Sequence, residues 1–478
     1  MLIEDLYRAP WHERMNEVIK NMVEDVITDL EILVQEIKEW EDSEVRANMI
    51  IGERYYLNKT DILEKKQKIE WKSNQKLAHG FAKKLVDQKI GYLLAKEPTF
   101  GTENVAYRKL ITETFDRGLL KKIKNVGKEA VNKGIAYLHP FFNESGELSF
   151  KKFPSEQIIV NWADNEHMEA LSFTRVYEVS GYVGRKKVTK KKVEYYHSGG
   201  VKYYVFDGGK LIPDVEAGIE KEYHFLINDK PFAWEKIPLI HFKYNEEEQP
   251  LIDSIKSLID NYNTQASTNA DLLADIPKFI YKLINYGGED LAGFLHDLNV
   301  YMAVNLDKDG DVDKLQADIQ TDAVEKEIDR NRNSIYEFGR GVDTRETGLR
   351  DASGVALRFR YSDLDMDCNI LESEFQSSIE HMLYFINVYF NETGKGDYFD
   401  EKVNTIFNRD IIVAETEAID NCGKSTGILD DQTIRENHPW YKEDVEKRLK
   451  EQEEKEQGEY NNYQQAFQNR GGVNGEEE

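Results

Sequence analysis

The 478-residue sequence predicts an α+β protein that is mainly helical. Apolar residues recur every three or four positions over much of the chain, as they do on one face of a helix. From Gly134 to Pro250 the period changes to short runs rich in Val, Tyr, Phe and Thr, separated by turn signals such as Ser198-Gly199-Gly200 and Asp207-Gly208-Gly209. An apolar face then persists from about Val355 to Asn391, which predicts a helix roughly 55 Å long. The sequence therefore combines helices at both ends with a central antiparallel sheet region.

Composition and charge exclude several classes of protein. The chain holds 89 acidic and 63 basic residues, a formal charge of -26. Because DNA is itself densely negative, we expect no DNA-coating protein, and one that handles DNA would do so with local cations. Cys368 and Cys422 are too few for a disulfide scaffold. With no signal peptide and no apolar run near the roughly 18 residues of a membrane span, we expect a soluble, intracellular protein with no membrane partner.

The N-terminal third predicts helices. Helical stripes run from Trp11 to Trp40 and from Leu77 to Leu93, and the second should stop at Lys96-Glu97-Pro98. A further helix is expected from Ala106 to Lys133. Within the strand region, the basic run Arg185 to Lys192 lies beside a hairpin. It could bind nucleic acid, but lysines on an exposed edge strand also prevent unwanted sheet pairing, and we favour that interpretation.

A helix that starts near Leu251 carries unusually little charge. Between Ser257 and Ala270 only Asp260 is charged, in a chain that is 32% charged. Such a helix suits packing against copies of itself better than facing water. The residues expected at that contact are Leu258, Tyr262, Asn263, Ala266 and Asn269.

A charged helix is expected from Thr321 to Gly341, and the segment between it and the preceding helix should form a small module of strands and short helices. Next comes the break GRGVDTRETGLRDASG, where glycines allow the chain to bend. All its cations are arginines. In a monomer they would cap helices or pair with nearby carboxylates, whereas in a ring they would form a belt of positive charge able to touch phosphates. The arginines are Arg340, Arg345 and Arg350, followed by Arg358 and Arg360.

Two motifs resemble enzyme sites. Ala418 to Ser425 nearly matches a phosphate-binding loop, but it lacks the leading glycine and reads as the end of a helix with Gly423 as its cap. Asn305 to Gln316 resembles a calcium loop but ends in Gln and follows a strand-like segment, so an acidic turn is the better interpretation. A weak divalent-ion site there would use Asp307, Asp309, Asp311 and Asp313.

The remaining sequence shows no zinc-ligand spacing and no nucleophile elbow. We therefore expect no enzyme and no cofactor. After the long helix, VNTIFNRDIIVAE reads as strands, followed by a helical section with turns at Gly423, Gly427 and Pro439. The tail rich in Glu, Gln and Asn predicts disorder.

Four segments in this order resemble the portal proteins of tailed bacteriophages, in the branch from long-tailed phages of Gram-positive hosts. The resemblance covers roughly Ile51 to Glu454. The segments are RYYLNKTDI, NQKLAHGFAKKLVDQKIGYLLAKEP, IPLIHFKYNEEEQPLIDSIKSLIDNYNTQASTNADLLADI and GLRDASGVALRFRYSDLDMDC.

The resemblance implies a structural ring, usually of twelve copies, at one vertex of the capsid in the virion, assembled in the host cytoplasm. Double-stranded DNA would be packaged, retained and ejected through it. Implied partners are the terminase packaging motor, scaffolding and major capsid proteins, and a head-completion or adaptor protein.

The family's layout divides this chain into named regions. In the tunnel loop, Arg345, Thr347 and Arg350 would face the DNA channel. The alternatives are a nucleotide- or metal-dependent enzyme using residues 418–425 or 305–316, and a monomeric helical scaffold. The implied regions are a wing (1–248), two stem helices (249–275 and 321–341) around a clip (276–320), the tunnel loop and start of the long helix (342–363), the long wing helix and strands (364–414), a crown (415–456) and a disordered tail (457–478).

Overall fold

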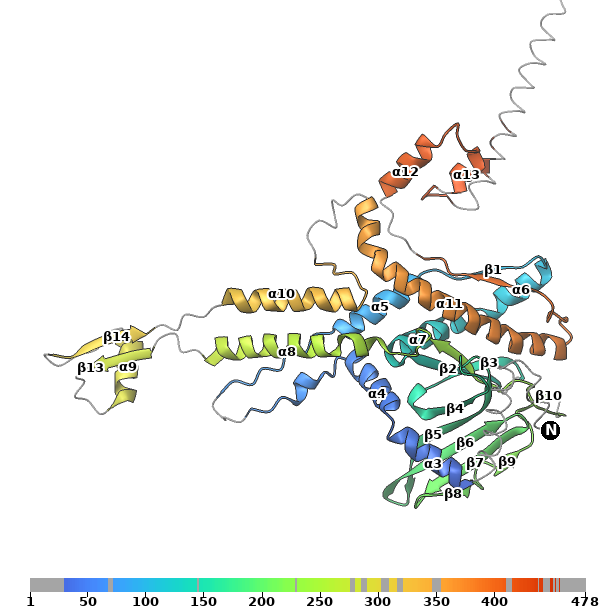
Figure 1. The fold of residues 1–478 in the computed structure, drawn as a ribbon, viewed down its shortest axis with the longest axis horizontal. Coiled ribbons are helices and arrows are strands. Elements are labelled where there is room, and N and C mark those ends of the chain that lie inside the picture. Colours follow the sequence, from blue (N-terminus) through green and yellow to red (C-terminus); the bar gives the residue numbers. More distant parts are fainter. Residues whose placement is uncertain are drawn as a thin grey trace, which may run out of the picture. The chain divides into compact units, whose positions relative to one another are not determined.

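The computed structural model describes residues 30–67, 72–143, 146–227, 230–275, 280–284, 290–301, 309–315, 321–345, 354–409, 415–436 and 438–441, together with 448–449, 452 and 455. The chain divides into two compact units. One comprises Met1–Asp343 and Asp363–Asp410, and the other comprises Thr344–Ser362 and Ile411–Glu478. Figure 1 labels the helices and strands of both.

The first described helices are α3 (Leu30–Glu41) and α4 (Glu44–Tyr56). Ser43 separates them, because its side chain caps α4 by accepting a hydrogen bond from the backbone N–H of Arg46. The predicted opening helix is confirmed from Leu30 onward, and residues 1–29 lie outside the described part. A short turn of 3₁₀ helix (Asp61–Glu64) follows.

Two helix predictions in this region were wrong in their bounds. α5 covers Phe81–Leu93, and residues 72–80 before it are not helical. The expected helix from Ala106 to Lys133 is two helices, α6 (Val105–Thr114) and α7 (Arg117–Lys133), because Asp116 caps the second. The predicted end at Gly134 is confirmed, with Gly134 at φ 85°, where glycine has no steric penalty.

The predicted antiparallel sheet region is confirmed and contains two main sheets. One has three strands in the order β12-β2-β3. The other has six: five lie in the order β4-β5-β6-β7-β8, and the short strand β9 also pairs with β7. Gly208 and Gly209 both have positive φ in the two-residue turn between β7 and β8, as the sequence indicated. The strands are β2 (Ile135–Phe142), β3 (Leu148–Phe153), β4 (Ile158–Trp162), β5 (Ala170–Val183), β6 (Lys186–His197), β7 (Gly200–Asp207), β8 (Lys210–Pro213), β9 (Glu220–Lys221), β10 (Phe225–Ile227), β11 (Lys230–Phe232) and β12 (Ile240–Lys243).

The basic run does not lie on an edge strand of this sheet. β6 is a central strand, and β7 pairs with it from Lys191 to His197. The first part of β6, through Lys190, pairs only with β5. The two strands thus extend past the sheet as a ribbon with exposed lysines, so the edge-protection argument applies to this ribbon.

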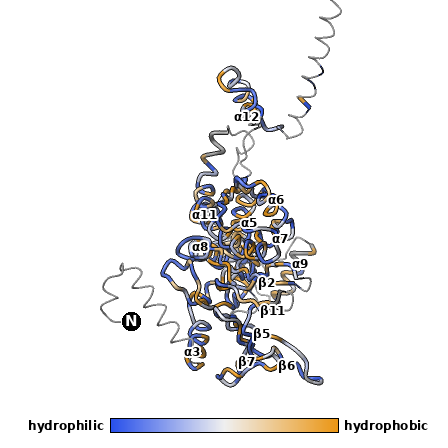
Figure 2. The backbone as a smooth tube through the Cα atoms, turned by 90° about the vertical axis from the view of Figure 1, so that its right-hand side faces the viewer, coloured by the Kyte–Doolittle hydropathy of each residue, from blue (hydrophilic) through white to orange (hydrophobic). Residues whose placement is uncertain are grey.

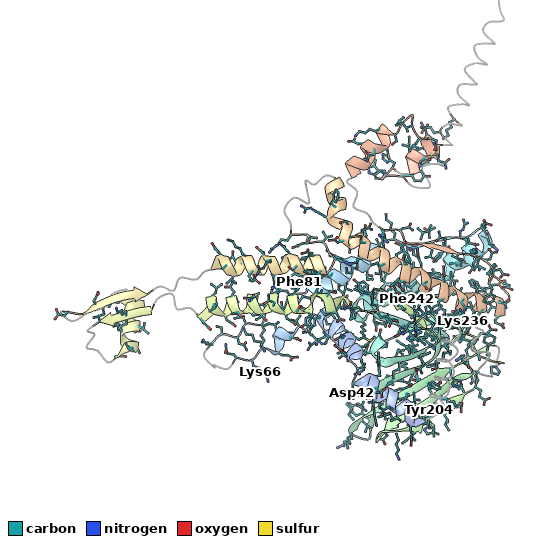
Figure 3. The ribbon with its side chains drawn as sticks, viewed as in Figure 1. Asp42, Lys66, Phe81, Tyr204, Lys236 and Phe242 are labelled. Carbon is teal, nitrogen blue, oxygen red and sulfur yellow. The ribbon has the colours of Figure 1, made fainter. Side chains whose placement is uncertain are left out.

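The predicted long helix is confirmed as α11 (Gly354–Glu392), and the division between the two units falls within it at Asp363. From Leu364 on, its apolar face is fully buried, and Phe375 packs edge-on against Phe242 of β12 at 5.1 Å between ring centroids. Figure 2 shows hydrophobic residues gathered where α5, α7, α11 and β2 meet, and Figure 3 labels Phe242 there. α11 is therefore a core helix of the first unit.

Short elements complete the chain. β1 (Thr99–Gly101) pairs with β15 (Asn404–Ile406), which confirms part of the strand prediction after α11. In the second unit, α12 (Glu415–Lys424) and α13 (Asp431–Glu436) confirm a helical C-terminal section, with a turn at Gly427, φ 83°.

Candidate functional site

Two helices that pack together form the candidate stem. They are α8 (Leu251–Asp275) and α10 (Thr321–Phe338). Phe81 at the start of α5 joins them, with its ring 4.8 Å from that of Tyr262 in α8 and 6.0 Å from that of Tyr336 in α10. Figure 3 shows Phe81 beside both helices. These aromatic contacts fix the base of the pair.

The outer face of α8 is a continuous uncharged stripe. Its members are exposed and recur at steps of three and four residues, so they lie on one side of the helix. The two charged residues between Ser254 and Thr268, Lys256 and Asp260, are half-buried and pair with each other at 2.7 Å. The face therefore offers only small polar groups to whatever lies beside it. We call Ser254, Ser257, Asn261, Thr264 and Thr268 the polar stripe.

The inner face of α8 holds an extended segment, which we call the strap (residues 72–79). Alternate backbone N–H groups of the strap donate to side-chain oxygens at every fourth residue of α8. The spacings match, because two extended residues span about 6.6 Å and four helical residues about 6.0 Å. The pairs are Ser73 to Asp275 at 2.8 Å, Gln75 to Asp271 at 2.6 Å, Leu77 to Ser267 at 3.0 Å and His79 to Asn263 at 3.0 Å.

The strap explains where the predicted stem residues lie. Tyr262 and Asn263 are buried within the subunit, and the amide of Asn263 also donates to Thr60 at 3.2 Å. These two side chains therefore make contacts within their own subunit and are not exposed to a neighbouring one. Leu258, Ala266 and Asn269 are half-buried, and the polar stripe, which the sequence analysis had not separated from them, is the exposed face.

Between α8 and α10 the chain forms a hairpin and a helix. β13 (Ile280–Ile284) pairs with β14 (Asp311–Leu315), and α9 spans Leu291–Tyr301. The segment before the calcium-like motif is thus helical as far as Tyr301, contrary to the strand expectation. Asp311 and Asp313 lie within β14 rather than in a loop, Asp309 lies at a turn, and Asp307 is outside the described residues. No group of three or more candidate metal ligands occurs in the part of the chain that the structure describes.

After α10 the chain is anchored before it enters the arginine-bearing loop. The Gln88 side chain binds the carbonyl of Val342 at 2.8 Å and its N–H at 3.2 Å, and Arg332 binds Asp343 through both Nε (2.5 Å) and Nη2 (2.7 Å). Arg340 has φ 46° and lies 3.5 Å from Asp367. The loop therefore leaves from a fixed base.

A buried ion pair lies beneath this base. Lys89 of α5 is fully buried and binds Asp367 of α11 at 2.6 Å, and it also donates to the carbonyl of Arg340 at 3.2 Å. Tyr244 donates to the same carboxylate at 2.9 Å. Burial lowers the pKa of Lys89 and the Asp367 carboxylate opposes that shift. This cluster ties α5, α11 and the end of α10 together.

The glycines at the base serve close packing rather than bending. Gly339 and Gly341 do not adopt positive φ. Instead, a Cβ on Gly341 would lie 2.1 Å from the buried Leu85 side chain, and one on Gly339 would lie 2.7 Å from it. At residues 339–343 the chain turns through Arg340, at φ 46°, and the two glycines let it pack closely against Leu85.

The predicted loop residues are only partly described. Arg345 is exposed, in a turn at the start of the second unit, whereas Thr347 and Arg350 lie outside the described residues. Arg358 and Arg360 belong to α11 rather than to a loop. Arg340 is paired with Asp367, as expected for a cation that stabilises the chain.

The nucleotide-binding motif is contradicted by its conformation. Ala418 to Lys424 are all helical in α12, and so is Gly423, which was expected to cap the helix. A phosphate-binding loop needs a non-helical turn ahead of its helix. Among the described helices none has the length and apolarity needed to cross a membrane.

These features define a structural subunit with a helical stem, a hairpin module on the stem and an anchored loop. Comparison with known proteins agrees. The family model described as phage portal protein, SPP1 Gp6-like, matches residues 36–459. The portal protein of Bacillus phage SPP1 is 30% identical over 458 residues, covering 92% of this chain and 90% of the relative. That of Clostridium phage phiCD119 is 28% identical over 430 residues, covering 85% and 92%.

The chain therefore belongs to the SPP1 Gp6-like family of phage portal proteins. Portal proteins are structural proteins of the virion. Among solved structures, a chain in the neck of a native gene transfer agent particle matches 74% of this chain and 88% of its own, with a TM-score of 0.42 and 9% identity. A chain in the virion of the same kind of particle matches with a TM-score of 0.41 and 11% identity.

Proposed function

We propose that copies of this chain, twelve in number, close into a ring at one capsid vertex and that double-stranded DNA is packaged, retained and ejected through the central channel. The polar stripe on α8 carries this proposal. Net charge of one sign makes identical surfaces repel one another. A helix face of Ser, Thr and Asn in an acidic chain lets neighbouring copies approach without that repulsion.

The regions of the chain fit this assembly. The stem would be α8 and α10, the clip would be β13, α9 and β14, and the wing would contain the sheets with α11 from Leu364 on. The crown would contain α12 and α13. The clip would meet the terminase packaging motor and later a head-completion or adaptor protein, while the outer regions would meet scaffolding and major capsid proteins during assembly in the host cytoplasm.

A pair of charges in the polar stripe tests the assembly. We expect Ser257→Asp with Thr264→Asp to prevent ring formation, because each subunit then brings two new negative charges to its neighbour. Native mass measurement with scaffolding and capsid proteins present would show this. The matched control is Ser180→Asp with Thr189→Asp, which adds the same charge at two exposed positions of the β5–β6 ribbon. Equal loss of rings in both variants would contradict the role of the stripe.

In the ring, Arg345, Thr347 and Arg350 would lie in the tunnel loop and face the DNA. Charge reversal at Arg345 and Arg350 should alter DNA packaging or retention while rings still form, since the loop leaves from an anchored base. The DNA content of purified heads measures this. Reversal at the exposed Lys210 and Lys402 is the control for net charge. Normal DNA content in Arg345→Glu/Arg350→Glu heads would refute the assignment.

A further inference from the structure

A cavity of about 650 Å³ lies in the first unit, and no residue of the stem helices lines it. It lies where the end of α5, the first half of α7, α11 and the residue after β15 meet. Its size falls in the range of about 300–1,000 Å³ in which proteins hold ligands. The floor is apolar and buried. It comprises Leu94, Ile123, Ile379 and Phe407.

The rim of this cavity is basic. Arg117, Lys121 and Lys124 follow each other at steps of four and three, so they line one face of α7. All three are exposed, and in the described part of the chain none of them forms an ion pair. Lys96 and Glu97 complete the rim. A chain with a net charge of -26 thus gathers three exposed cations around one apolar hollow, whose rim holds a single acid, Glu97.

The first two-thirds of α7 is strongly basic, in contrast to the rest of the chain. Residues 117–128 contain five cations and no acid, although acids outnumber cations in the whole sequence. Cations near a helix N-terminus are disfavoured by the helix dipole. Two of the five have partners within the chain: Lys122 donates a hydrogen bond to the carbonyl of Phe150, and Lys128 forms an ion pair with Asp87. The other three surround the cavity, where an anion would relieve their mutual repulsion.

We propose that this cavity binds an acidic peptide segment of a partner protein, with one large apolar side chain in the hollow and carboxylates on the three cations. The aliphatic floor fits a Phe or Leu side chain. The side chains of this floor offer a nucleic acid base no hydrogen-bonding group and only one aromatic ring, Phe407. Because the cavity lies within one subunit, this inference does not depend on ring formation or on the DNA channel.

The test measures peptide binding to the full-length protein by fluorescence anisotropy. The probe is a fluorescein-labelled peptide of Glu and Asp around a central Phe. We expect Lys121→Glu with Lys124→Glu to weaken binding by about tenfold or more, as removal of charge-assisted contacts does. Lys186→Glu with Lys187→Glu is the control, because both residues are exposed on the β5–β6 ribbon and the change in net charge is the same.

Two further probes separate the alternatives. The same peptide with Ser in place of Phe should bind more weakly than the parent, and a single-stranded oligonucleotide should not compete with the parent. The proposal is overturned if the acidic peptide fails to bind at low salt, or if both double variants lose binding equally. It is also overturned if the Ser peptide binds as well as the parent, or if the oligonucleotide displaces it.

Discussion

Single residues at the base of the loop set its geometry. Asp367 receives contacts from Lys89, Tyr244 and Arg340, so one carboxylate joins three segments of the chain. Gly341 allows Leu85 to pack directly against the backbone. Neither role depends on other copies of the chain, so both can be measured on a single subunit.

Replacement of Asp367 should be strongly destabilising. Asp367→Ala leaves the Lys89 ammonium buried without its partner, which costs about 3–5 kcal/mol. Urea unfolding followed by circular dichroism measures this, and adding Lys89→Met should recover part of the loss. Asp363→Ala, one turn earlier in α11 at an exposed position, should change the free energy of unfolding by less than about 0.5 kcal/mol. Similar values for Asp363→Ala and Asp367→Ala would show that the buried pair contributes little.

Addition of one methyl group at Gly341 should also be costly. In Gly341→Ala the new Cβ overlaps the buried Leu85, and overpacking of this kind costs about 1–3 kcal/mol. Gly91→Ala in α5 is the matched control, because no atom lies within 4 Å of the added group. That change should stabilise the helix by up to about 1 kcal/mol. Thermal unfolding compares the two, and a neutral Gly341→Ala would mean that the chain bends freely there.

At the scale of elements, the strap and α8 form one polar ladder. Four side chains on one face of α8 satisfy four backbone N–H groups that would otherwise need a strand partner. This explains why residues 77–80 are not helical although the apolar spacing from Leu77 suggested a helix. The ladder leaves the polar stripe as the free face of α8.

The ladder predicts a local effect of mutation. Asn263→Ala should destabilise the subunit by about 1–3 kcal/mol, because the N–H of His79 and the hydroxyl of Thr60 lose a buried partner. Hydrogen exchange at the amides of residues 73–79 should become faster. Thr264→Ala, its exposed neighbour on α8, is the control and should leave this exchange unchanged. Unchanged exchange in Asn263→Ala would show that the strap is held by other contacts.

Local patterns predicted the elements better than the contacts between them. α11 was expected from Val355 to Asn391 and runs from Gly354 to Glu392, because its apolar period lies within one segment. The strap was missed, since Asn263 and His79 are 184 residues apart and no period links them. Likewise, the sequence alone cannot show that Gly341 meets Leu85. The loop residues Thr347 and Arg350 stay predictions.

At the scale of the whole molecule, membership of the portal family and the uncharged face of the stem both support the proposal that copies of the chain assemble. The acidic chain is expected to keep DNA from adhering, and the uncharged stripe to let copies meet. The cavity beside α7 departs from this charge pattern by combining a basic rim with an apolar floor, which is why we connect it with a separate acidic partner.

The account depends on copies closing side by side along their stems. Electron microscopy of the protein produced together with its scaffolding and capsid proteins tests this most directly. We predict closed rings with a central channel, in which the polar stripe of each α8 lies against the neighbouring subunit. Particles of a single subunit under every assembly condition, or rings whose stems do not touch, would contradict the account.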